Sequence, residues 1–435
     1  MMIKRENIVT ICYSDIAGQL RGKGFPACEL EGRRRFGIGW APSNVMINCF
    51  GRIPATPFGT RGDLMIVPSA EGDIRLDYGD DGVVEHLILG DVQGLDGSPW
   101  SCCPRSFLRK AIAALAGEFG LQLRVSFEHE FWLDYPEEGS GRASTVGRLR
   151  GLEPFIGDVL GALRANDIVP DSFLPEFGPG QFEITVDPAA ALAAADHAVK
   201  LREICRSVAR RHGRRISFSP VVTPGIVGNG VHIHFSLLDE AGVAVGHDAD
   251  RPGGLSDAFG AFAAGILHHA PALLAVTAPS VVSYERMKPG FWSPLHASIA
   301  EGDRGALLRI CPVPRQPDLD VARLYNLEYR GADASASPYL KLGMLIFAGL
   351  EGLRRNLPAP PVAGGHRRND RDLQGFSLLP RSLADSLQAL ETDEAARGWL
   401  GPEFSEVYLM HKRAELATAG DVELEELCRR YADVY

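Results

Sequence analysis

Apolar and polar residues alternate in four segments of the chain, as they do in strands that bury one face. In residues 121–133, LQLRVSFEHEFWL, most apolar side chains would share one side, whereas Glu128 and Glu130 would share the other. The same alternation recurs in QFEITVD, VHIHFSL and NLEYR, which begin at Gln181, Val231 and Asn326. Antiparallel sheets often pack one face and leave the other polar. We therefore expect strands of one sheet whose polar face carries Glu, His and Arg.

Two carboxylates on one strand face repel each other, and a divalent cation makes such a pair tolerable. The ligands expected on the polar face are five carboxylates and one imidazole: Glu128, Glu130, Glu176, Glu183, Glu328 and His232. A set this rich in carboxylates favours Mg²⁺ or Mn²⁺ over zinc. Taken singly, an E-x-E pair is more often a solvated strand face, so the argument depends on several motifs occurring together.

Turn-rich and helix-rich regions divide the chain unequally. Residues 1–100 read as short strands and turns, with many Gly and Pro, as in FGRIPATPFGTRGD. The composition changes near Pro104, which lies near the start of an amphipathic helix predicted over residues 105–119. Further helices are predicted near 154–166 and 188–211, and the tail from Leu379 reads as helical. The pattern predicts an α+β protein with domains at 1–103 and 104–435.

Composition places the chain among ordinary globular proteins. It has 435 residues, of which 45% are hydrophobic and 23% charged, and a formal net charge of −10. The negative charge argues against non-specific nucleic-acid binding. The most apolar stretch, residues 259–282, contains two His and two Pro and is interpreted as a buried helix followed by a loop, so no membrane span is expected. The eight scattered cysteines and the absence of a signal-like start predict a cytoplasmic protein with reduced thiols.

Several motifs, in a fixed order over nearly the whole chain, resemble the glutamine synthetase superfamily. They are the E-x-E pair, LPEFGPGQFE from Leu174, GNGVHIHFS from Gly228, SYERMKPG from Ser283, the arginines Arg304 and Arg309, and E-x-R at Glu328–Arg330 followed by Pro338–Tyr339–Leu340. Each motif is weak alone, but their common order is specific. The resemblance implies a small β-grasp-like N-terminal domain and a large catalytic domain with a curved antiparallel sheet.

The resemblance also implies a role for each candidate residue. One metal would be held by Glu130, Glu176 and Glu183, and a second by Glu128, His232 and Glu328. His234, Ser236 and Arg309 would contact the nucleotide, with Arg309 near its phosphates. Arg304 would stabilise the transferring phosphoryl group, Arg286 and Arg330 would bind the carboxylates of glutamate, and the Gly228 carbonyl would lie near its amino group. Arg304, Glu328 and Arg286 are the residues expected to act in catalysis.

The chemistry implied by the resemblance suits these residue types. ATP phosphorylates the γ-carboxylate of glutamate, and an amine displaces phosphate from the acyl phosphate. Two anionic reactants must be brought together, and metals and arginines offset their repulsion. The resemblance further implies a homo-oligomer, a dodecamer of two hexameric rings with active sites between neighbouring subunits.

Two departures from the family concern the amine. Glutamine synthetases carry an aspartate in a D-G-S-S segment that helps bind ammonium, whereas FGIGWAPSNVM, from Phe36 to Met46, has none. They also carry a glutamate two residues after the P-G of the arginine loop, where Trp292 stands here. An apolar wall suits a carbon-bearing amine better. These replacements resemble the γ-glutamylamide branch, which includes the γ-glutamylpolyamine synthetases, and predict an organic amine as acceptor, with Trp292 lining its site.

Other interpretations remain open. Trp292 could serve only in packing, and the protein would then be an ammonia-using glutamine synthetase. A non-catalytic structural or regulatory homologue is a third reading, which loss of metal ligands would favour, but all six are present. Val227 stands where the family usually has an asparagine, so recognition of the glutamate amino group could differ in detail. The sequence does not identify the amine.

Overall fold

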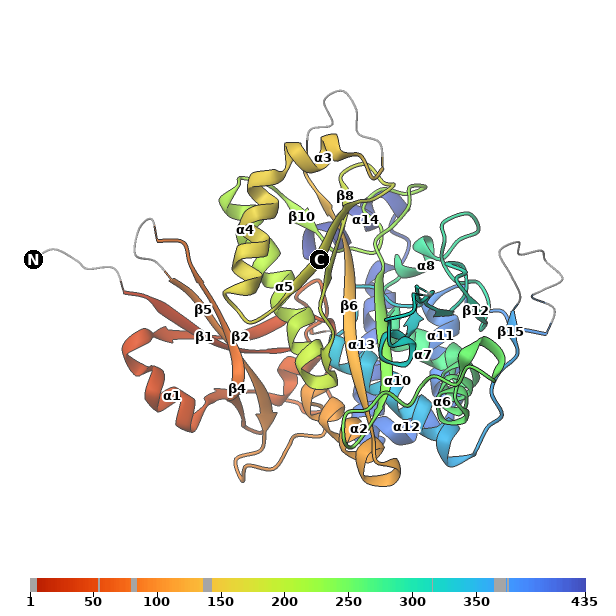
Figure 1. Cartoon of the computed structure of the whole chain (residues 1–435). Helices are drawn as coiled ribbons and strands as arrows, with labels where there is room; N and C mark the ends of the chain where they lie inside the picture. Colours follow the sequence, from red (N-terminus) through yellow and green to blue (C-terminus); the bar gives the residue numbers. More distant parts are fainter. Residues whose placement is uncertain are drawn as a thin grey trace, which may run out of the picture.

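Two β-sheets and a layer of helices build the protein. The computed structural model describes residues 6–53, 55–79, 84–135, 143–314, 316–363, 373 and 375–435. The N-terminal strands form a five-stranded sheet that extends to one side, and the later strands form a larger sheet at the centre of the molecule (Figure 1). The predicted α+β class is confirmed.

The first sheet has the order β2-β1-β5-β4-β3. Its strands are β1 (Ile8–Ser14), β2 (Leu20–Pro26), β3 (Ile38–Trp40), β4 (Leu64–Asp77) and β5 (Val84–Gln93). Strands β1 and β5 pair in parallel at the centre, and the other pairs are antiparallel. This arrangement matches the expected β-grasp-like domain. Its core includes Ile11, Ile66 and Ile88, all fully buried.

The second sheet has the order β15-β12-β13-β14-β11-β6-β8-β7, with β9 and β10 also paired to β6. Its strands are β6 (Leu121–Leu133), β7 (Pro170–Pro175), β8 (Gln181–Val186), β9 (Ala189–Ala190), β10 (Ile216–Ser217), β11 (Val231–Asp239), β12 (Ile299–Glu301), β13 (Leu308–Ile310), β14 (Leu327–Tyr329) and β15 (Val362–Ala363). The pairs around β6 and β11 are antiparallel, and among the described strands of this sheet only the short edge pairs of β12 with β13 and with β15 are parallel. The four strands predicted from alternation are β6, β8, β11 and β14.

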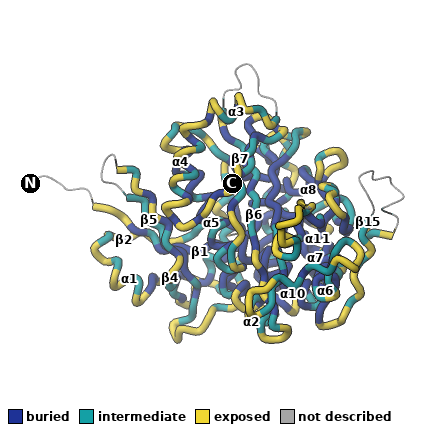
Figure 2. The backbone as a smooth tube through the Cα atoms, viewed as in Figure 1, coloured by how far each residue is buried: buried dark blue, intermediate teal, exposed yellow. Residues whose placement is uncertain are grey.

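Helices connect the strands, and some of them cover the apolar face of the second sheet. They are α1 (Leu30–Phe36), α2 (Pro104–Phe119), α3 (Val146–Gly151), α4 (Glu153–Arg164), α5 (Ala191–Arg211), α6 (Asp257–His268), α7 (Ala270–Thr277), α8 (Ser283–Arg286), α9 (Val321–Leu324), α10 (Pro338–Arg354), α11 (Leu383–Thr392), α12 (Glu394–Leu400), α13 (Pro402–Ala419) and α14 (Leu424–Val434). Figure 2 shows buried segments gathered around β6 and the neighbouring helices, whereas α1 has no buried residue and α4 buries only one face, with Phe155, Val159 and Leu163.

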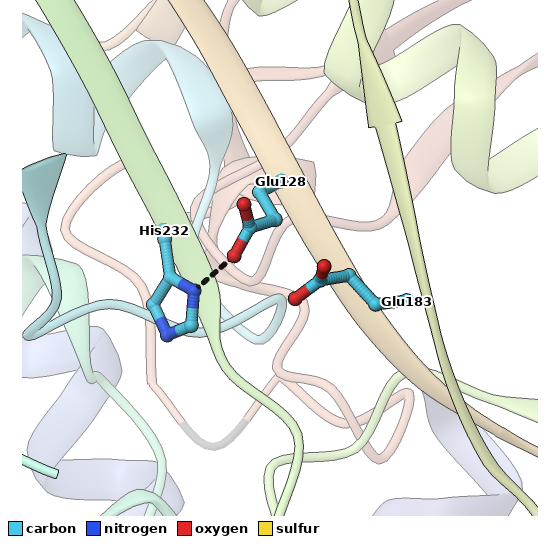
Figure 3. A group of neighbouring side chains, drawn as sticks. All are labelled: Glu128, Glu183 and His232. Atoms are coloured by element: carbon cyan, nitrogen blue, oxygen red, sulfur yellow. Dashed lines mark hydrogen bonds and ion pairs between the residues drawn. The ribbon is translucent and has the colours of Figure 1, made fainter. Parts of the chain in front are cut away.

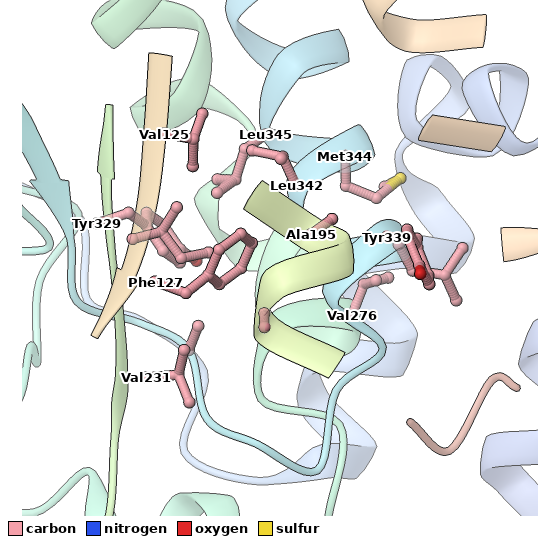
Figure 4. Packing of buried hydrophobic residues seen from close by; sticks show 14 of the residues in the cluster. Val125, Phe127, Ala195, Val231, Val276, Tyr329, Tyr339, Leu342, Met344 and Leu345 are labelled. Atoms are coloured by element: carbon pink, nitrogen blue, oxygen red, sulfur yellow. The ribbon is translucent and has the colours of Figure 1, made fainter. Parts of the chain in front are cut away.

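The alternation of β6 divides its side chains as predicted. Phe127 and Val125 are buried on the apolar face, where they pack with Leu342 and Leu345 of α10 and Ala195 of α5 (Figure 4). Burying a large apolar side chain stabilises the fold by about 1.5–3 kcal/mol. This packing fixes β6 against the helices, so the opposite face of the strand is held rigidly for the polar side chains.

Two helical expectations need correction. The helix predicted from residue 188 begins at Ala191, because Ala189 and Ala190 first pair with β6 as β9. The apolar stretch predicted as one helix and a loop forms two helices, α6 and α7, which meet at His269 at an angle of 75°. Within the described ranges no single helix is long and apolar enough to span a bilayer, and only this bent pair passes when its halves are taken together.

Candidate functional site

Strand register brings the predicted polar residues into one group. Glu128 lies opposite His232 across the β6–β11 pair, and Glu130 lies opposite Glu183 across the β6–β8 pair. Glu328 of β14 lies opposite His234 of β11. The side chains of Glu128, Glu183 and His232 converge from three neighbouring strands (Figure 3). The group therefore depends on long-range pairing and on the two-residue repeat of each strand.

The imidazole of His232 lies among three carboxylates. Its Nδ1 atom is 2.6 Å from Oε1 of Glu128 and 3.6 Å from Oε1 of Glu328, and its Nε2 atom is 3.9 Å from Oε1 of Glu130. On the other side of Glu128, Oε2 is 3.5 Å from Nε2 of His234. Glu128 is thus the residue through which both imidazoles are connected.

Two sets of side chains bring their ligand atoms within 4.8 Å of one another. One set is Glu128, Glu183 and His232, and the other is Glu128, His234 and Glu328. These sets cross the predicted division, because Glu183 joins Glu128 and His232, and His234 joins Glu128 and Glu328. The six predicted ligands lie on or beside the polar face of the second sheet, and we call this group of side chains the carboxylate floor. Which of the six share an ion stays a prediction.

Charge on the floor is unevenly compensated. Burial raises the pKa of Glu183, and the nearby carboxylates of Glu128 and Glu130 raise it further. Burial and then the charge of Glu130 also raise the pKa of Glu176. Raised carboxylate pKa values mean that the floor holds more negative charge than its protein partners offset. A hard divalent cation would supply the missing positive charge, so the donor set fits Mg²⁺ or Mn²⁺.

Glu128 and Glu328 behave in the opposite way. Burial alone would raise the pKa of Glu128, but hydrogen bonds from His232 and His234 outweigh it and hold the pKa well below its ordinary value. Burial is likewise outweighed at Glu328, where His232 and Arg330 lower the pKa to about 2. Both carboxylates are therefore ionised at neutral pH and available as charged ligands.

Two arginines flank the floor at Glu328. Nη1 of Arg309 is 2.7 Å from Oε2 of Glu328, and Arg330 forms an ion pair with Oε1 of the same carboxylate. Arg330 also donates through Nε to the Arg304 carbonyl at 2.8 Å and through Nη2 to the Trp292 carbonyl at 3.3 Å. Arg330 thus fixes two loops beside the floor. The Arg304 side chain itself is exposed.

Arg286 lies behind the glycine loop and is buried. Its Nη2 donates to the Ala332 carbonyl at 3.0 Å, whereas its Nε finds no hydrogen-bond partner among the described residues. Burial lowers its pKa. A buried guanidinium with unused donor capacity is suited to bind an anion.

The glycine loop is connected to the floor by a residue that the sequence analysis did not select. Nε2 of Gln181 donates to the Gly228 carbonyl at 2.9 Å and lies 3.4 Å from Oε2 of Glu130. The backbone N–H of Gly230 donates to the same Glu130 oxygen at 2.6 Å. Gln181 is the Gln of the G-Q motif, so its position at the start of a carboxylate strand was the available signal. It holds Glu130 and Gly228 in a fixed relation.

A cavity of about 730 Å³ opens beside the floor at β11, the strand that carries His232 and His234. Glu128, His234 and Ser236 line it, together with Arg124 and Arg323. The Ser236 hydroxyl donates to the Tyr325 carbonyl at 2.9 Å, and Nδ1 of His234 is 3.0 Å from the Asn326 amide oxygen. The volume suits a small-molecule ligand.

A crevice of similar size, about 710 Å³, lies near α14 and is lined by Arg215, Glu426 and Asp433. None of the predicted ligands lines this second crevice. Volume alone therefore does not identify the site. The side chains that line the cavity at β11 identify that cavity as the candidate site.

Aromatic residues stand at the rim. The rings of Phe177 and Trp292 have centroids 4.4 Å apart, and both side chains are largely exposed. Phe177 directly follows Glu176, and the Trp292 carbonyl accepts the hydrogen bond from Arg330. The sequence analysis selected Trp292 but not Phe177, because nothing local to EFGPGQ indicates that its ring meets another aromatic residue.

Comparisons with known proteins agree with this geometry. The family model described as "Glutamine synthetase, catalytic domain" matches residues 101–429, and "Glutamine synthetase N-terminal domain" matches residues 2–100. The chain is 33% identical to gamma-glutamylpolyamine synthetase GlnA3 of Streptomyces coelicolor over 95% of its length and 90% of the relative. It is 31% identical to a glutamine synthetase of Halobacterium salinarum, with 93% and 89% covered. A crystal structure of a novel glutamine synthase homologue superposes with a TM-score of 0.92 and 37% identity, covering all of both chains.

Proposed function

Since the chain belongs to the glutamine synthetase family and is an ATP-dependent carbon–nitrogen ligase, we propose that it joins the γ-carboxylate of glutamate to an organic primary amine. The observation that carries the choice of amine is Trp292, which stands where the family's ammonium-binding enzymes have a glutamate. The similarity to a polyamine-using relative supports the proposal, but similarity to a glutamine synthetase is nearly as great. The decision therefore depends on the residues around the acceptor.

The carboxylate floor would hold the divalent ions that family members use with ATP. Glu130, Glu176 and Glu183 are proposed for one ion, and Glu128, His232 and Glu328 for the other. Bound Mg²⁺ or Mn²⁺ supplies positive charge that offsets the repulsion between the nucleotide phosphates and the carboxylate of glutamate. The protein contributes rigidity, because five of these ligands extend from strands whose other face is packed in the core and Glu176 directly follows β7.

The substrates would occupy the two sides of this floor. The cavity at His234 and Ser236 is proposed for the nucleotide, with Arg309 facing its phosphates. Arg286 and Arg330 are proposed for the carboxylates of glutamate, and the Gly228 carbonyl for its ammonium group. Arg330 is already oriented by Glu328 and by two backbone carbonyls, so little rearrangement is needed when an anion binds.

Two bond exchanges complete the reaction. An oxygen of the γ-carboxylate bonds to the γ-phosphorus of ATP, and the bond between that phosphorus and the bridging oxygen of ADP breaks. The neutral amine nitrogen then bonds to the carbon of the γ-carboxyl group, the bond between that carbon and the phosphate oxygen breaks, and the proton lost by the nitrogen goes to the departing phosphate. Arg304 and Arg309 would offset the charge on the transferring phosphoryl group. Exclusion of bulk water protects the acyl phosphate from hydrolysis.

The acceptor argument rests on solvation. Ammonium is small and strongly hydrated, so a site must replace its water with anionic oxygens. Trp292 offers an aromatic surface in that place, and residues 36–46 carry no aspartate. An organic amine gains instead about 0.8 kcal/mol for each methylene that it buries. Several buried methylenes give a preference of about 10²-fold over ammonium.

A direct comparison of substrates tests the proposal. ADP release is measured with glutamate, ATP and Mg²⁺, and kcat/KM is determined for ammonium and for primary amines of increasing size. We expect at least one organic amine to exceed ammonium by about 10²-fold. If ammonium is equal or better, the protein is an ammonia-using glutamine synthetase and Trp292 serves in packing. If no acceptor supports ADP release with glutamate, the proposed reaction is refuted.

A further inference from the structure

Two aromatic rings meet at the rim of the site although most of each remains in contact with solvent. Phe177 is 60% exposed and Trp292 is 50% exposed, while their ring centroids lie 4.4 Å apart with planes inclined by 47°. Single exposed apolar residues are common, but adjacent ones form a patch that usually has a binding role. The rings contact each other through part of their surface and leave the rest available.

The two rings are attached to opposite sides of the site. The backbone N–H of Phe177 donates to Oε2 of Glu176 at 3.2 Å, so the base of this residue is tied to a predicted metal ligand. The Trp292 carbonyl accepts from Nη2 of Arg330 at 3.3 Å, so the base of the other residue is tied to a predicted glutamate-binding arginine. The rings therefore bridge the carboxylate side and the arginine side, next to the place where the γ-carboxylate would react.

The backbone at Trp292 supports a role beyond packing. Its φ is +49°, a left-handed conformation that residues with a side chain rarely adopt. Residues held in such conformations cluster at ligand-binding sites, because the surrounding structure must maintain them. Here the hydrogen bond from Arg330 and the contact with Phe177 maintain the orientation of the ring.

We propose that Phe177 is a specificity-determining residue, and that Phe177 and Trp292 together form a wall against which the hydrocarbon chain of the acceptor amine packs. This inference rests on the proposed ligase function and names the acceptor class as primary alkylamines of several methylenes. Ring faces provide apolar contact for methylenes. Ammonium has no carbon chain and gains nothing from the second ring.

The test follows the dependence of kcat/KM on chain length. Methylamine, propylamine and pentylamine are compared as acceptors for the wild-type enzyme and for Phe177→Ala, under saturating ATP and glutamate. A fully buried methylene corresponds to about a fourfold gain in kcat/KM. We expect a gain of about two- to fourfold per methylene in the wild type and a clearly smaller gain in the variant. The decrease in kcat/KM caused by Phe177→Ala would reach about tenfold for pentylamine and be smallest for methylamine.

Further variants separate packing against the amine from general damage. Phe177→Tyr keeps the ring and is expected to keep the chain-length dependence, whereas Phe177→Leu keeps an apolar side chain without a ring face. Phe119→Ala removes a partly exposed ring at the end of α2 and is the matched control. Thermal unfolding and light scattering of each variant report folding and assembly.

The outcomes distinguish the inference from the proposed function. If ammonium equals or exceeds every organic amine in the wild type, the proposed function fails. If the wild type uses other organic amines but no alkylamine, the acceptor class inferred here is overturned while the function stands. If the wild type uses alkylamines and Phe177→Ala lowers kcat/KM equally for all of them, the wall is overturned while the function stands. Dissociation of the assembly with the same uniform loss would assign Phe177 to a subunit contact and also overturn the inference. Loss of chain-length dependence in Phe177→Ala, with Phe177→Tyr normal, supports it.

Discussion

Replacing Gly228 with alanine tests whether the glycine loop positions a carbonyl for glutamate. A Cβ atom at this position would lie 2.1 Å from the Pro220 carbonyl oxygen and 3.1 Å from Cγ of Arg286. The Pro220 oxygen is held in place, because it accepts a 2.8 Å hydrogen bond from the backbone N–H of Asn229. Since Cβ contacts below 3.0 Å essentially never occur, one backbone segment must move by about 1 Å.

We expect Gly228→Ala to lower kcat/KM for glutamate about 10²-fold, because a displacement of about 1 Å in a substrate-positioning group has an effect of that order. The overpacking also lowers the free energy of unfolding by about 1–3 kcal/mol. ADP release is measured against glutamate concentration at saturating ATP and amine, and thermal unfolding is recorded in parallel.

The matched control is Gly157→Ala in α4, where an added Cβ meets no atom within 4 Å. This change removes backbone freedom from a helix interior, so we expect unchanged kinetics and a gain of up to about 1 kcal/mol in the free energy of unfolding. A folded Gly228→Ala enzyme with wild-type kcat/KM for glutamate would refute the role given to the Gly228 carbonyl.

Further substitutions test the floor, the acceptor and the fold. Glu130→Ala is expected to abolish turnover and to weaken Mn²⁺ binding, which electron paramagnetic resonance measures. The circular dichroism spectrum is expected to stay native, because the residue lies on the polar face. Activity of the enzyme in EDTA would contradict the metal assignment. Trp292→Glu is expected to lower kcat/KM for the best amine and to raise the ratio of kcat/KM for ammonium to kcat/KM for that amine. An unchanged ratio would exclude contact between Trp292 and the acceptor. Glu415→Ala leaves the fully buried Lys412 without its 2.8 Å partner, and we expect denaturant titration to show a loss of about 3–5 kcal/mol. Light scattering is expected to show a dodecamer, and a fully active monomer would rule out sites shared between subunits.

The carboxylate floor could be predicted from the sequence because the alternation of apolar and charged residues that indicates it lies within single strands. In β6 the alternation of apolar and charged residues continues over the whole strand, so both its limits and its polar face could be predicted. The start of α5 was harder to predict from the sequence, because Ala189 and Ala190 have no intrinsic strand signal and form β9 only by pairing with β6. The division at residues 103 and 104 and the role of each site residue stay predictions.

The missed features depend on contacts between distant segments. Phe177 and Trp292 are 115 positions apart in the sequence, and no local pattern indicates that their rings meet. Gln181 reaches Gly228 only because β8 and β11, the strand that follows the glycine loop, both pair with β6. The participation of His234 beside Glu328 likewise follows from the register of β11 with β14, which the sequence does not specify.

Glu128 is common to both sets of potential ligands, so an ion bound in one set would be thermodynamically linked to an ion bound in the other. An ion in one set alters the charge and orientation that this carboxylate presents to the other. Reciprocity requires that each ion change the affinity for the other by the same factor, whichever binds first. The two ions would therefore titrate as a coupled pair with macroscopic constants, and a substitution at Glu128 would change both constants at once.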